Sequence, residues 1–164
     1  MSTLDVILSR RSIRKYQDKP IPKEALDKIL EAAKQAPSAV NKQPYRFVVV
    51  DDPEIKKELK SLLSRFLDKA PVVIVGCANI KALMTGKWAV IDTSIAFQNM
   101  VLAAWSLGVG SCWVGSFNEQ KIKELLKVPD KWKIVALVTF GYPDEQPKQR
   151  KKKPTDELFG INQF

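Results

Sequence analysis

The sequence predicts a three-layer α+β domain with a mixed sheet and helices on both faces of the sheet. Three observations support this fold class. Helical and β-rich segments are interleaved, but they do not follow the strict alternation that builds β–α–β units. The 164 residues contain no internal repeat and no linker long enough to divide them. Hydrophobic residues make up 45% of the chain, so a single domain over residues 1–164 can bury a core without disulfides.

The first half of the chain contains four segments with a recognisable period. Ser2 and Asp5 have capping-box spacing ahead of the first segment, and Pro22 can occupy the first position of the second. The third segment is β-rich and lies between two prolines, which is typical of a buried strand. The fourth has apolar residues at helical spacing along its whole length. We therefore expect a helix over 3–9, a helix from Pro22 to Gln35, a strand over Tyr45–Asp51 and a helix over Glu54–Lys69.

The second half adds three strand-like runs and two helices. One stretch is apolar almost all round and predicts a buried, central helix, in which the polar residues Asp92 and Asn99 share a face because they lie seven apart. Ser116 and Glu119 have capping-box spacing for the last helix. We expect a strand over Pro71–Ala78, the central helix over 89–107, a short strand or turn over Ser111–Gly115, a helix capped by Ser116 and a strand over Lys133–Gly141.

The chain ends in a segment of a different character. After Pro143 it becomes polar and basic, and it then closes with four large apolar residues, Leu158, Phe159, Ile161 and Phe164. Such a tail cannot pack by itself in water, so it must dock on its own domain or on that of a partner. The sequence leaves both destinations open.

Composition excludes several classes of site. The chain has no histidine, which excludes His-containing catalytic triads and acid–base catalysis by imidazole. Since it has only two cysteines and no histidine, we expect no zinc site. Cys77 and Cys112 form no CxxC pair and lie in apolar runs, as buried thiols do in a reducing compartment. No signal pattern and no clean apolar run of about 20 residues is visible, so we expect a cytoplasmic protein without a membrane span.

Nucleotide-binding fingerprints are absent as well. The chain has no P-loop, and its glycines at 108 and 110 do not continue into GxGxxG because position 113 is Trp. The net charge is nevertheless +9, with one basic cluster over 10–15 and another over 148–153. Such a surplus indicates a polyanion, an anionic ligand or a well-solvated basic surface.

Three segments carry candidate chemistry. Arg10–Arg14 combines cations with a hydroxyl, which suits a phosphate, although a solvated helix end has the same composition. Ala36–Pro44 offers neutral hydrogen-bonding groups in a rigid loop that could read the edge of a flat heterocycle, or it is simply a helix-to-strand connection. Cys112–Gly115 lets backbone approach a ligand, and Gln149–Lys152 could close on a phosphate from the other side. The alternative for Gln149–Lys152 is disorder or loose contact with polyanions.

In this order and spacing, the segments resemble the nitroreductase family of flavoproteins. The resemblance rests on RRSIR, APSAVNKQP, AFQNMVLAAWSLGVGSCWVG and TFGYPDEQPKQRKKKP, and it covers nearly the whole chain. It implies a three-layer α/β/α fold whose mixed sheet is mainly antiparallel. It also implies an intertwined homodimer with two FMN at the interface. The helix 89–107 would form the core of that interface, and residues 143–164 would reach the partner protomer.

The resemblance further implies a set of cofactor-binding residues. The N-terminal basic segment would approach the phosphate, ribityl chain and pyrimidine end of the flavin. The Ala36–Pro44 loop would come from the opposite protomer, and Cys112–Gly115 would lie near flavin N5. The basic tail would bind the phosphate. No side chain acts as a catalytic nucleophile, and none binds a metal. The implied cofactor-binding residues are Arg10, Arg11, Ser12, Arg14, Pro37, Ser38, Ala39, Asn41, Val114, Gly115, Arg150 and Lys152.

The activity implied is transfer of hydride from NADH or NADPH, through flavin N5, to a small acceptor such as a nitroaromatic or a quinone. Two departures from larger relatives affect acceptor choice. Val114 stands where they carry an acidic residue, and only the short segment Ile80–Trp88 replaces their inserted helices, which implies a more open pocket.

Alternatives remain open at this point. The same fold also serves dehalogenation of iodotyrosines and fragmentation of flavin. The chain could also be a non-catalytic FMN carrier. The basic charge suggests a nucleic-acid-binding module, but the aromatic residues lie in apolar runs rather than in a basic patch, so we expect no specific nucleic-acid partner.

Overall fold

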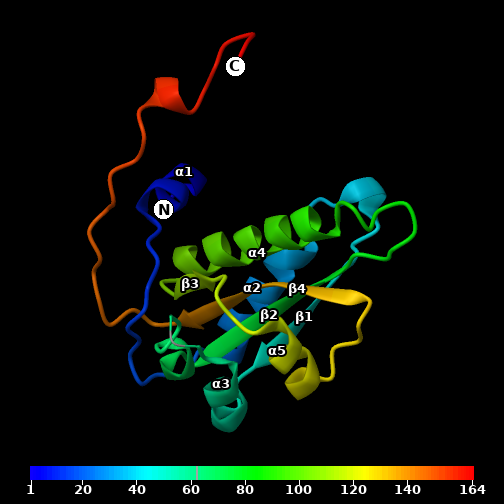
Figure 1. Cartoon of the computed structure of the whole chain (residues 1–164). Helices are drawn as coiled ribbons and strands as arrows, with labels where there is room; N and C mark the ends of the chain where they lie inside the picture. Colours follow the sequence, from blue (N-terminus) through cyan, green and yellow to red (C-terminus); the bar gives the residue numbers. More distant parts are fainter. Residues whose placement is uncertain (62) are drawn as a thin grey trace.

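A four-stranded antiparallel sheet forms the middle layer of the protein, whose computed structural model describes residues 1–61 and 63–164 (Figure 1). The strand order is β1-β2-β4-β3. β2 and β3 are separated by β4, which pairs antiparallel with both, and β1 pairs antiparallel with β2. The strands are β1 (Tyr45–Val50), β2 (Val72–Asn79), β3 (Gly110–Val114) and β4 (Trp132–Gly141).

The expectation of a mainly antiparallel sheet is therefore confirmed, whereas the expectation of a mixed sheet is wrong for these four strands. Strands that run in the same direction are not neighbours, because β2 lies between β1 and β4, and β4 lies between β2 and β3. Within the described part of the chain, the one parallel contact is an isolated bridge between Ser12 and Ser111 at the β3 edge.

Helices cover both faces of the sheet, which confirms the three-layer prediction (Figure 1). α2 (Lys23–Lys34) and α4 (Ala89–Ser106) pack on one face and on each other. α3 (Pro53–Leu59) and α5 (Glu119–Leu126) pack on the other. A separate apolar core fills each space between helices and sheet.

α4 is the central helix that its apolar composition predicts. Phe97 and Met100 are fully buried against the sheet, and the Phe97 ring lies 5.0 Å from that of Phe47 and 5.2 Å from that of Trp113. Gly76 of β2 makes room for this ring, because a Cβ there would lie 2.1 Å from Phe97 Cε2. No helix in the described residues is both long enough and apolar enough to span a membrane.

α1 (Thr3–Ser9) begins with the predicted capping box. The Ser2 hydroxyl accepts from the Asp5 amide at 3.2 Å, and the Asp5 carboxylate accepts from the Ser2 amide at 2.8 Å. The helix packs against α4, where Trp105 Nε1 donates to Ser9 Oγ at 2.9 Å. This position brings the C-terminal end of α1 to the β3 edge of the sheet. Pro22 immediately precedes α2, one position before the predicted one.

The prediction of one helix over Glu54–Lys69 is wrong. α3 ends at Leu59, and the chain makes a turn before a short 3-10 helix over Leu67–Lys69. Ser61 and Ser64 explain the break, because the Ser64 hydroxyl accepts from the Ser61 amide at 2.9 Å and so competes with helical hydrogen bonding. Leu62, part of the predicted apolar stripe, lies outside the described residues.

The predicted cap of the last helix is also wrong. Asn118, not Ser116, caps α5, and its Oδ1 accepts from the Lys121 amide at 2.9 Å. Glu119 serves a different element, since its carboxylate accepts from the Ile134 amide of β4 at 3.0 Å. The side chain expected to complete a capping box thus joins α5 to the sheet.

The tail leaves the sheet after β4 and runs past α1, away from the domain (Figure 1). Residues 148–164 are exposed throughout, and Phe159 and Ile161 are 69% and 84% exposed. Of the two destinations that the sequence leaves open, the apolar end does not use its own domain.

We predict that Gly76→Ala destabilises the protein by about 1–3 kcal/mol, because the added methyl group forces the Phe97 ring out of a tightly packed site. Urea unfolding of the cofactor-free protein measures the change. Gly115→Ala is the matched control, since nothing lies within 4 Å of a Cβ at that position. Equal stability of the two variants would contradict the packing assignment.

Candidate functional site

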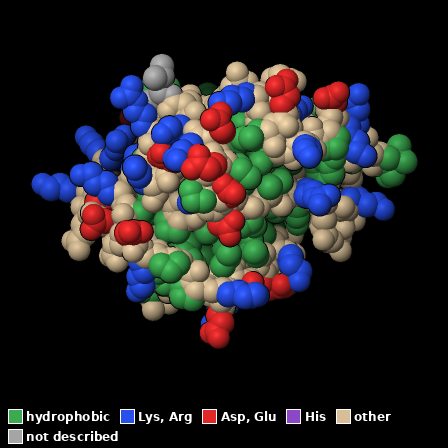
Figure 2. All heavy atoms as spheres, turned by 90° about the horizontal axis from the view of Figure 1, so that it is seen from below, with side chains coloured by type: hydrophobic (Ala, Val, Ile, Leu, Met, Phe, Trp, Pro, Cys, Tyr) green, Lys and Arg blue, Asp and Glu red, His purple; other side chains and the backbone are tan. Residues whose placement is uncertain are grey.

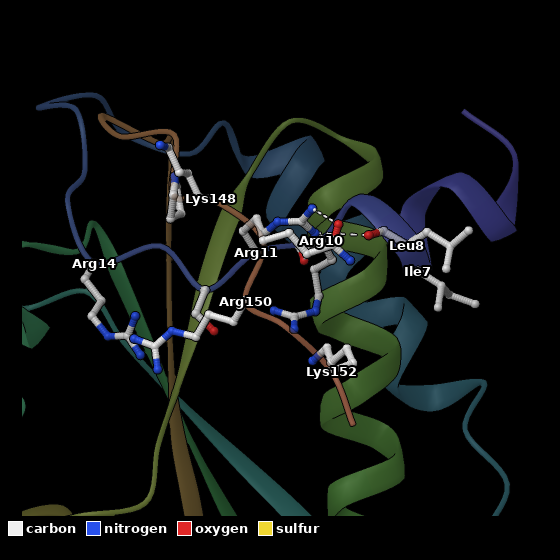
Figure 3. Close-up of a pocket in the computed structure, with 11 residues that line it drawn as sticks. Ile7, Leu8, Arg10, Arg11, Arg14, Lys148, Arg150 and Lys152 are labelled. Atoms are coloured by element: carbon white, nitrogen blue, oxygen red, sulfur yellow. Dashed lines mark hydrogen bonds between the residues drawn. The ribbon is translucent and has the colours of Figure 1, made fainter. Parts of the chain in front are cut away.

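A pocket of about 470 Å³ opens between the end of α1, the segment that follows it and the beginning of the tail (Figure 3). Its lining combines many cations with no carboxylate. Ser12 and Gln149 add neutral hydrogen-bonding groups, and Ile7 and Leu8 of α1 form an apolar wall. The cationic residues of the lining are Arg10, Arg11, Arg14, Lys148, Arg150 and Lys152.

The two basic segments meet because the chain crosses itself below the pocket. The Gln17 amide donates to the Tyr142 carbonyl, and the Asp144 amide donates to the Lys15 carbonyl, each at 2.9 Å. The Glu145 carboxylate strengthens the crossing by accepting from the amides of Arg14 at 2.5 Å and Lys15 at 3.1 Å. Residues more than 120 positions apart in sequence are thereby held side by side.

Partly buried hydrogen bonds attach the N-terminal segment to β3 and β4. The Ile13 amide donates to the Ser111 carbonyl of β3 at 2.9 Å. The Tyr16 hydroxyl lies 2.5 Å from the Ile13 carbonyl and 2.7 Å from Thr139 Oγ1 of β4. Burial raises the pKa of this hydroxyl well above its ordinary value, so Tyr16 remains a neutral donor. Ser12 and Arg14 therefore extend from a rigid strand-like segment.

The tail presents its cations on alternate residues, as an extended chain does. Lys148, Arg150 and Lys152 line the pocket, whereas Lys151 and Lys153 do not. Lys153 instead lies 3.4 Å from the carboxylate of Glu157. In Figure 3 the guanidinium groups of Arg14 and Arg150 point toward one another, and Arg10 and Lys152 approach in the same way.

Arg11 differs from the other cations in the lining. Its Nη1 donates to the carbonyls of Leu8, Ser9 and Arg10 at 3.0, 2.8 and 2.9 Å, which satisfies the C-terminal end of α1. Its Nη2 donates to Gln149 Oε1 at 3.1 Å and so connects α1 to the tail. The helix-end interpretation holds for this residue, which builds the pocket wall.

The pocket has the electrostatic character of an anion site. On the face that carries α3 and α5, Asp and Glu side chains are interspersed among the more numerous Lys and Arg (Figure 2). Ion pairs such as that of Lys121 with Glu58 at 2.6 Å form there. In the pocket, the described residues offer no carboxylate to Arg10, Arg14 or Arg150. Guanidinium groups in this arrangement match the oxygens of a phosphate, so the lining fits the phosphate end of a mononucleotide such as FMN.

The remaining predicted site residues lie elsewhere in this single chain. The loop between α2 and β1 contains Pro37, Ser38, Ala39 and Asn41. Among the described residues, none of these four lines the cationic pocket. Val114 is buried at the end of β3, and Gly115 is exposed just beyond it with open space on its Cα. The structure therefore brings together Arg10, Arg11, Ser12, Arg14, Arg150 and Lys152, but not the other six residues.

Five lining residues were not among the predicted site residues, and one of them, Pro147, begins the basic tail. Lys148 and Gln149 lie in the basic tail, and the alternate spacing of Lys148, Arg150 and Lys152 was a signal that could have identified Lys148. Ile7 and Leu8 gave no such signal, because apolar residues of a short helix are normally assigned to packing.

Comparison with known proteins assigns the chain to a family. The model of the Nitroreductase family matches residues 7–75 and 59–142. A protein of Methanothermobacter thermautotrophicus, provisionally named as an NADH dehydrogenase/NAD(P)H nitroreductase, is 38% identical over 156 residues, which is 92% of this chain and 82% of that protein. An FMN reductase [NAD(P)H] of Bacillus subtilis is 29% identical over 177 residues, covering 93% of this chain and 70% of that protein.

Solved structures agree with the sequence comparison. An FMN-dependent nitroreductase of Clostridium difficile R20291 superposes with a TM-score of 0.86 at 35% identity, covering 98% of this chain and 99% of that one. Nitroreductase A of Vibrio parahaemolyticus superposes with a TM-score of 0.91 at 30% identity, covering 100% of this chain and 77% of that one. The chain therefore belongs to the nitroreductase family and is an NAD(P)H oxidoreductase of that family.

Proposed function

We propose that the protein is an FMN-dependent oxidoreductase that passes hydride from NADH or NADPH to a small acceptor such as a nitroaromatic or a quinone. The observation that carries this proposal is the cationic pocket, in a chain that belongs to the nitroreductase family. When bound, FMN supplies the hydride chemistry, and the protein supplies binding, orientation and electrostatics.

The pocket would hold the phosphate end of the cofactor. Arg10, Arg14 and Arg150 offer guanidinium groups that the described residues leave without carboxylate partners, and Lys152 adds a point charge. Ser12 lies in the same lining and can donate from its hydroxyl. Each charge-assisted hydrogen bond to a phosphate contributes roughly 1.5–3 kcal/mol, so several together give tight binding. Arg11 would act by holding α1 and the tail in place.

A second copy of the chain would complete the site. Leu4, Ile7 and Leu8 of α1 and Ile91 and Ile95 of α4 are all exposed, and the apolar end of the tail is exposed as well. In a homodimer, the exposed side chains of α1 and α4 on one protomer could pack against the apolar end of the tail from the other, and both surfaces would then be removed from water. Residues 143–164 would then reach the partner protomer.

The loop residues would contribute to the flavin site of the partner. In the proposed dimer, Pro37, Ser38, Ala39 and Asn41 of one protomer contact the flavin that the other protomer holds by its phosphate. Val114 and Gly115 would lie near flavin N5, where the open space at Gly115 allows close approach of backbone.

Acceptor choice would depend on a short segment. Between β2 and α4 the chain makes turns over residues 80–88, and Leu83 and Met84 are 87% and 78% exposed. A segment this short leaves the space above the flavin open, which favours broad acceptor specificity.

The cysteines fit the cytoplasm. Both Cys77 and Cys112 are free and buried, as thiols are in a reducing compartment, and burial raises the pKa of the Cys77 thiol to about 11.

The visible absorption spectrum tests the proposed function directly. We expect flavin bands that co-purify with the protein or saturate at about one FMN per chain, and that bleach on addition of NADH or NADPH. A protein that binds FMN but is not reduced by either nucleotide would favour a flavin carrier. A protein that neither takes up FMN nor quenches its fluorescence would overturn the proposal and direct attention to polyanions.

A paired substitution tests the phosphate assignment. We expect the double substitution Arg150→Ala and Lys152→Ala to weaken FMN binding by orders of magnitude, about 1.5–3 kcal/mol for each lost contact. Both side chains are exposed, so the fold should survive. The control is Lys151→Ala with Lys153→Ala, which removes the same charge from residues outside the lining. Equal FMN affinities of the two double variants, measured by fluorescence titration, would exclude this phosphate site.

Truncation tests the role proposed for the tail. We expect deletion of residues 155–164 to destabilise the dimer, because it removes the exposed apolar residues from Leu158 onward. Analytical ultracentrifugation across a dilution series should then show dissociation at a higher concentration than for the full chain. A truncated chain with the same dissociation constant and melting temperature would argue against docking on the partner.

A further inference from the structure

The loop between α2 and β1 has an unusual backbone. Val40, Asn41 and Gln43 have φ angles of 45°, 55° and 49°, in the left-handed region. Asn adopts this region readily, but a β-branched residue such as Val is an outlier there. The Val40 side chain is also 71% exposed, so its burial within the chain does not compensate the strain. Such a conformation persists only where the surrounding contacts over-determine it.

Some of those contacts lie within the loop itself. The Ser38 hydroxyl accepts from the Gln43 amide at 3.0 Å, and Gln43 Nε2 donates to Asn41 Oδ1 at 3.1 Å. These hydrogen bonds close the loop on itself. They fix its internal shape but not its orientation relative to the sheet and helices.

Asp92 provides a contact that orients the loop relative to α4, while the Asn79 amide at the end of β2 donates to the Pro44 carbonyl at the far end of the loop. The Ala39 amide lies 3.3 and 3.2 Å from the two carboxylate oxygens of Asp92, which is 4% exposed in the first turn of α4. The helix N-terminus favours a negative charge at this position. The Tyr45 hydroxyl lies close enough to feel this carboxylate: desolvation raises the pKa of the hydroxyl, and the Asp92 charge raises it further.

Asn99, the other polar residue on this face of α4, makes a different contact. Its Nδ2 donates to the Ala32 carbonyl inside α2 at 3.2 Å. Asn99 therefore connects α4 to α2, whereas Asp92 connects α4 to the loop between α2 and β1. A buried carboxylate is costly unless it accepts a hydrogen bond, and the hydrogen bond from Ala39 is the one that the described residues offer it.

We propose that Asp92 is a positioning residue for the cofactor. Acting through the Ala39 amide, its carboxylate fixes Ser38, Ala39 and Asn41 in the orientation in which they contact the flavin. Asp92 itself does not touch the cofactor. This inference rests on the proposed function, because it assumes that the loop contacts FMN.

Four substitutions separate positioning from general stability. Asp92→Ala removes the acceptor, and Asp92→Asn keeps an oxygen that can accept from Ala39. Ala39→Pro removes the donor instead. Proline fits at this position because Ser38 before it is extended (φ −142°, ψ 158°) and Ala39 begins a 3-10 turn. Asn99→Ala is the matched control, since it removes the polar contact that does not reach the loop.

Two measurements are required, one of them without FMN. In the FMN-free protein, we expect Asp92→Ala to accelerate amide hydrogen exchange over residues 37–44, and Asn99→Ala to leave that exchange unchanged. In FMN titrations, we expect Asp92→Ala to weaken binding at least about tenfold, Asp92→Asn to restore much of the affinity, and Asn99→Ala to lower the melting temperature alone. In the Ala39→Pro background, Asp92→Ala should cause no further loss.

The outcomes distinguish the two proposals. Wild-type protein that does not bind FMN would overturn the proposed function and this inference with it. Wild-type protein that binds FMN, with an Asp92→Ala variant of equal affinity, would overturn this inference alone. An affinity lost equally in Asp92→Ala and Asn99→Ala would also overturn it, because the effect would then follow from stability rather than from the loop.

Discussion

Mutual repulsion among the cations of one pocket is the constraint on which the site depends. Arg10, Arg14, Arg150 and Lys152 would separate if nothing else held their backbones. The crossing of the two segments opposes this repulsion by backbone hydrogen bonds and by Glu145, whose carboxylate accepts from two amides rather than from a cationic side chain. The positive charge of the pocket therefore stays available to a ligand, while the geometry is fixed below it.

The central helix α4 imposes a second constraint. It is apolar on nearly every side, and the sheet, α2 and α1 cover most of it but leave Ile91 and Ile95 exposed. Each polar side chain on its α2 face has a defined partner outside the helix, the Ala39 amide for Asp92 and the Ala32 carbonyl for Asn99. The same helix that fills the core thus also places the loop between α2 and β1, and core packing and loop orientation are not independent.

Much of the fold could be predicted from the sequence because it depends on local pattern. The capping box at Ser2, the strands between prolines and the apolar central helix are all properties of short windows. The prediction of a long helix over Glu54–Lys69 failed because Phe66 and Leu67 have helical spacing but reach the core from a turn and the short 3-10 helix that follows it. Local hydrogen bonds of Ser61 and Ser64 decide that turn, and a periodicity argument does not include them.

The site could be predicted only in part. The alternate spacing of the cations in the tail indicated which of their side chains point to the same side of an extended chain. The structure agrees, because Arg150 and Lys152 line the pocket and Lys151 does not. The role of Arg11 at the end of α1 depends on how α1 is oriented, and that orientation is a tertiary property. The resemblance implied a mainly antiparallel sheet, but the strand order and the partner of Glu119 were beyond reach, because both depend on β4 returning between β2 and β3.

The exposed tail has a thermodynamic consequence. Lys148, Arg150 and Lys152 lie on a segment that its own domain does not bury. If a neighbouring copy orders that segment, association of the subunits and retention of the cofactor become reciprocally linked, and each increases the affinity of the other by the same factor. Dilution alone would then release the cofactor from a chain whose individual contacts to it had not changed.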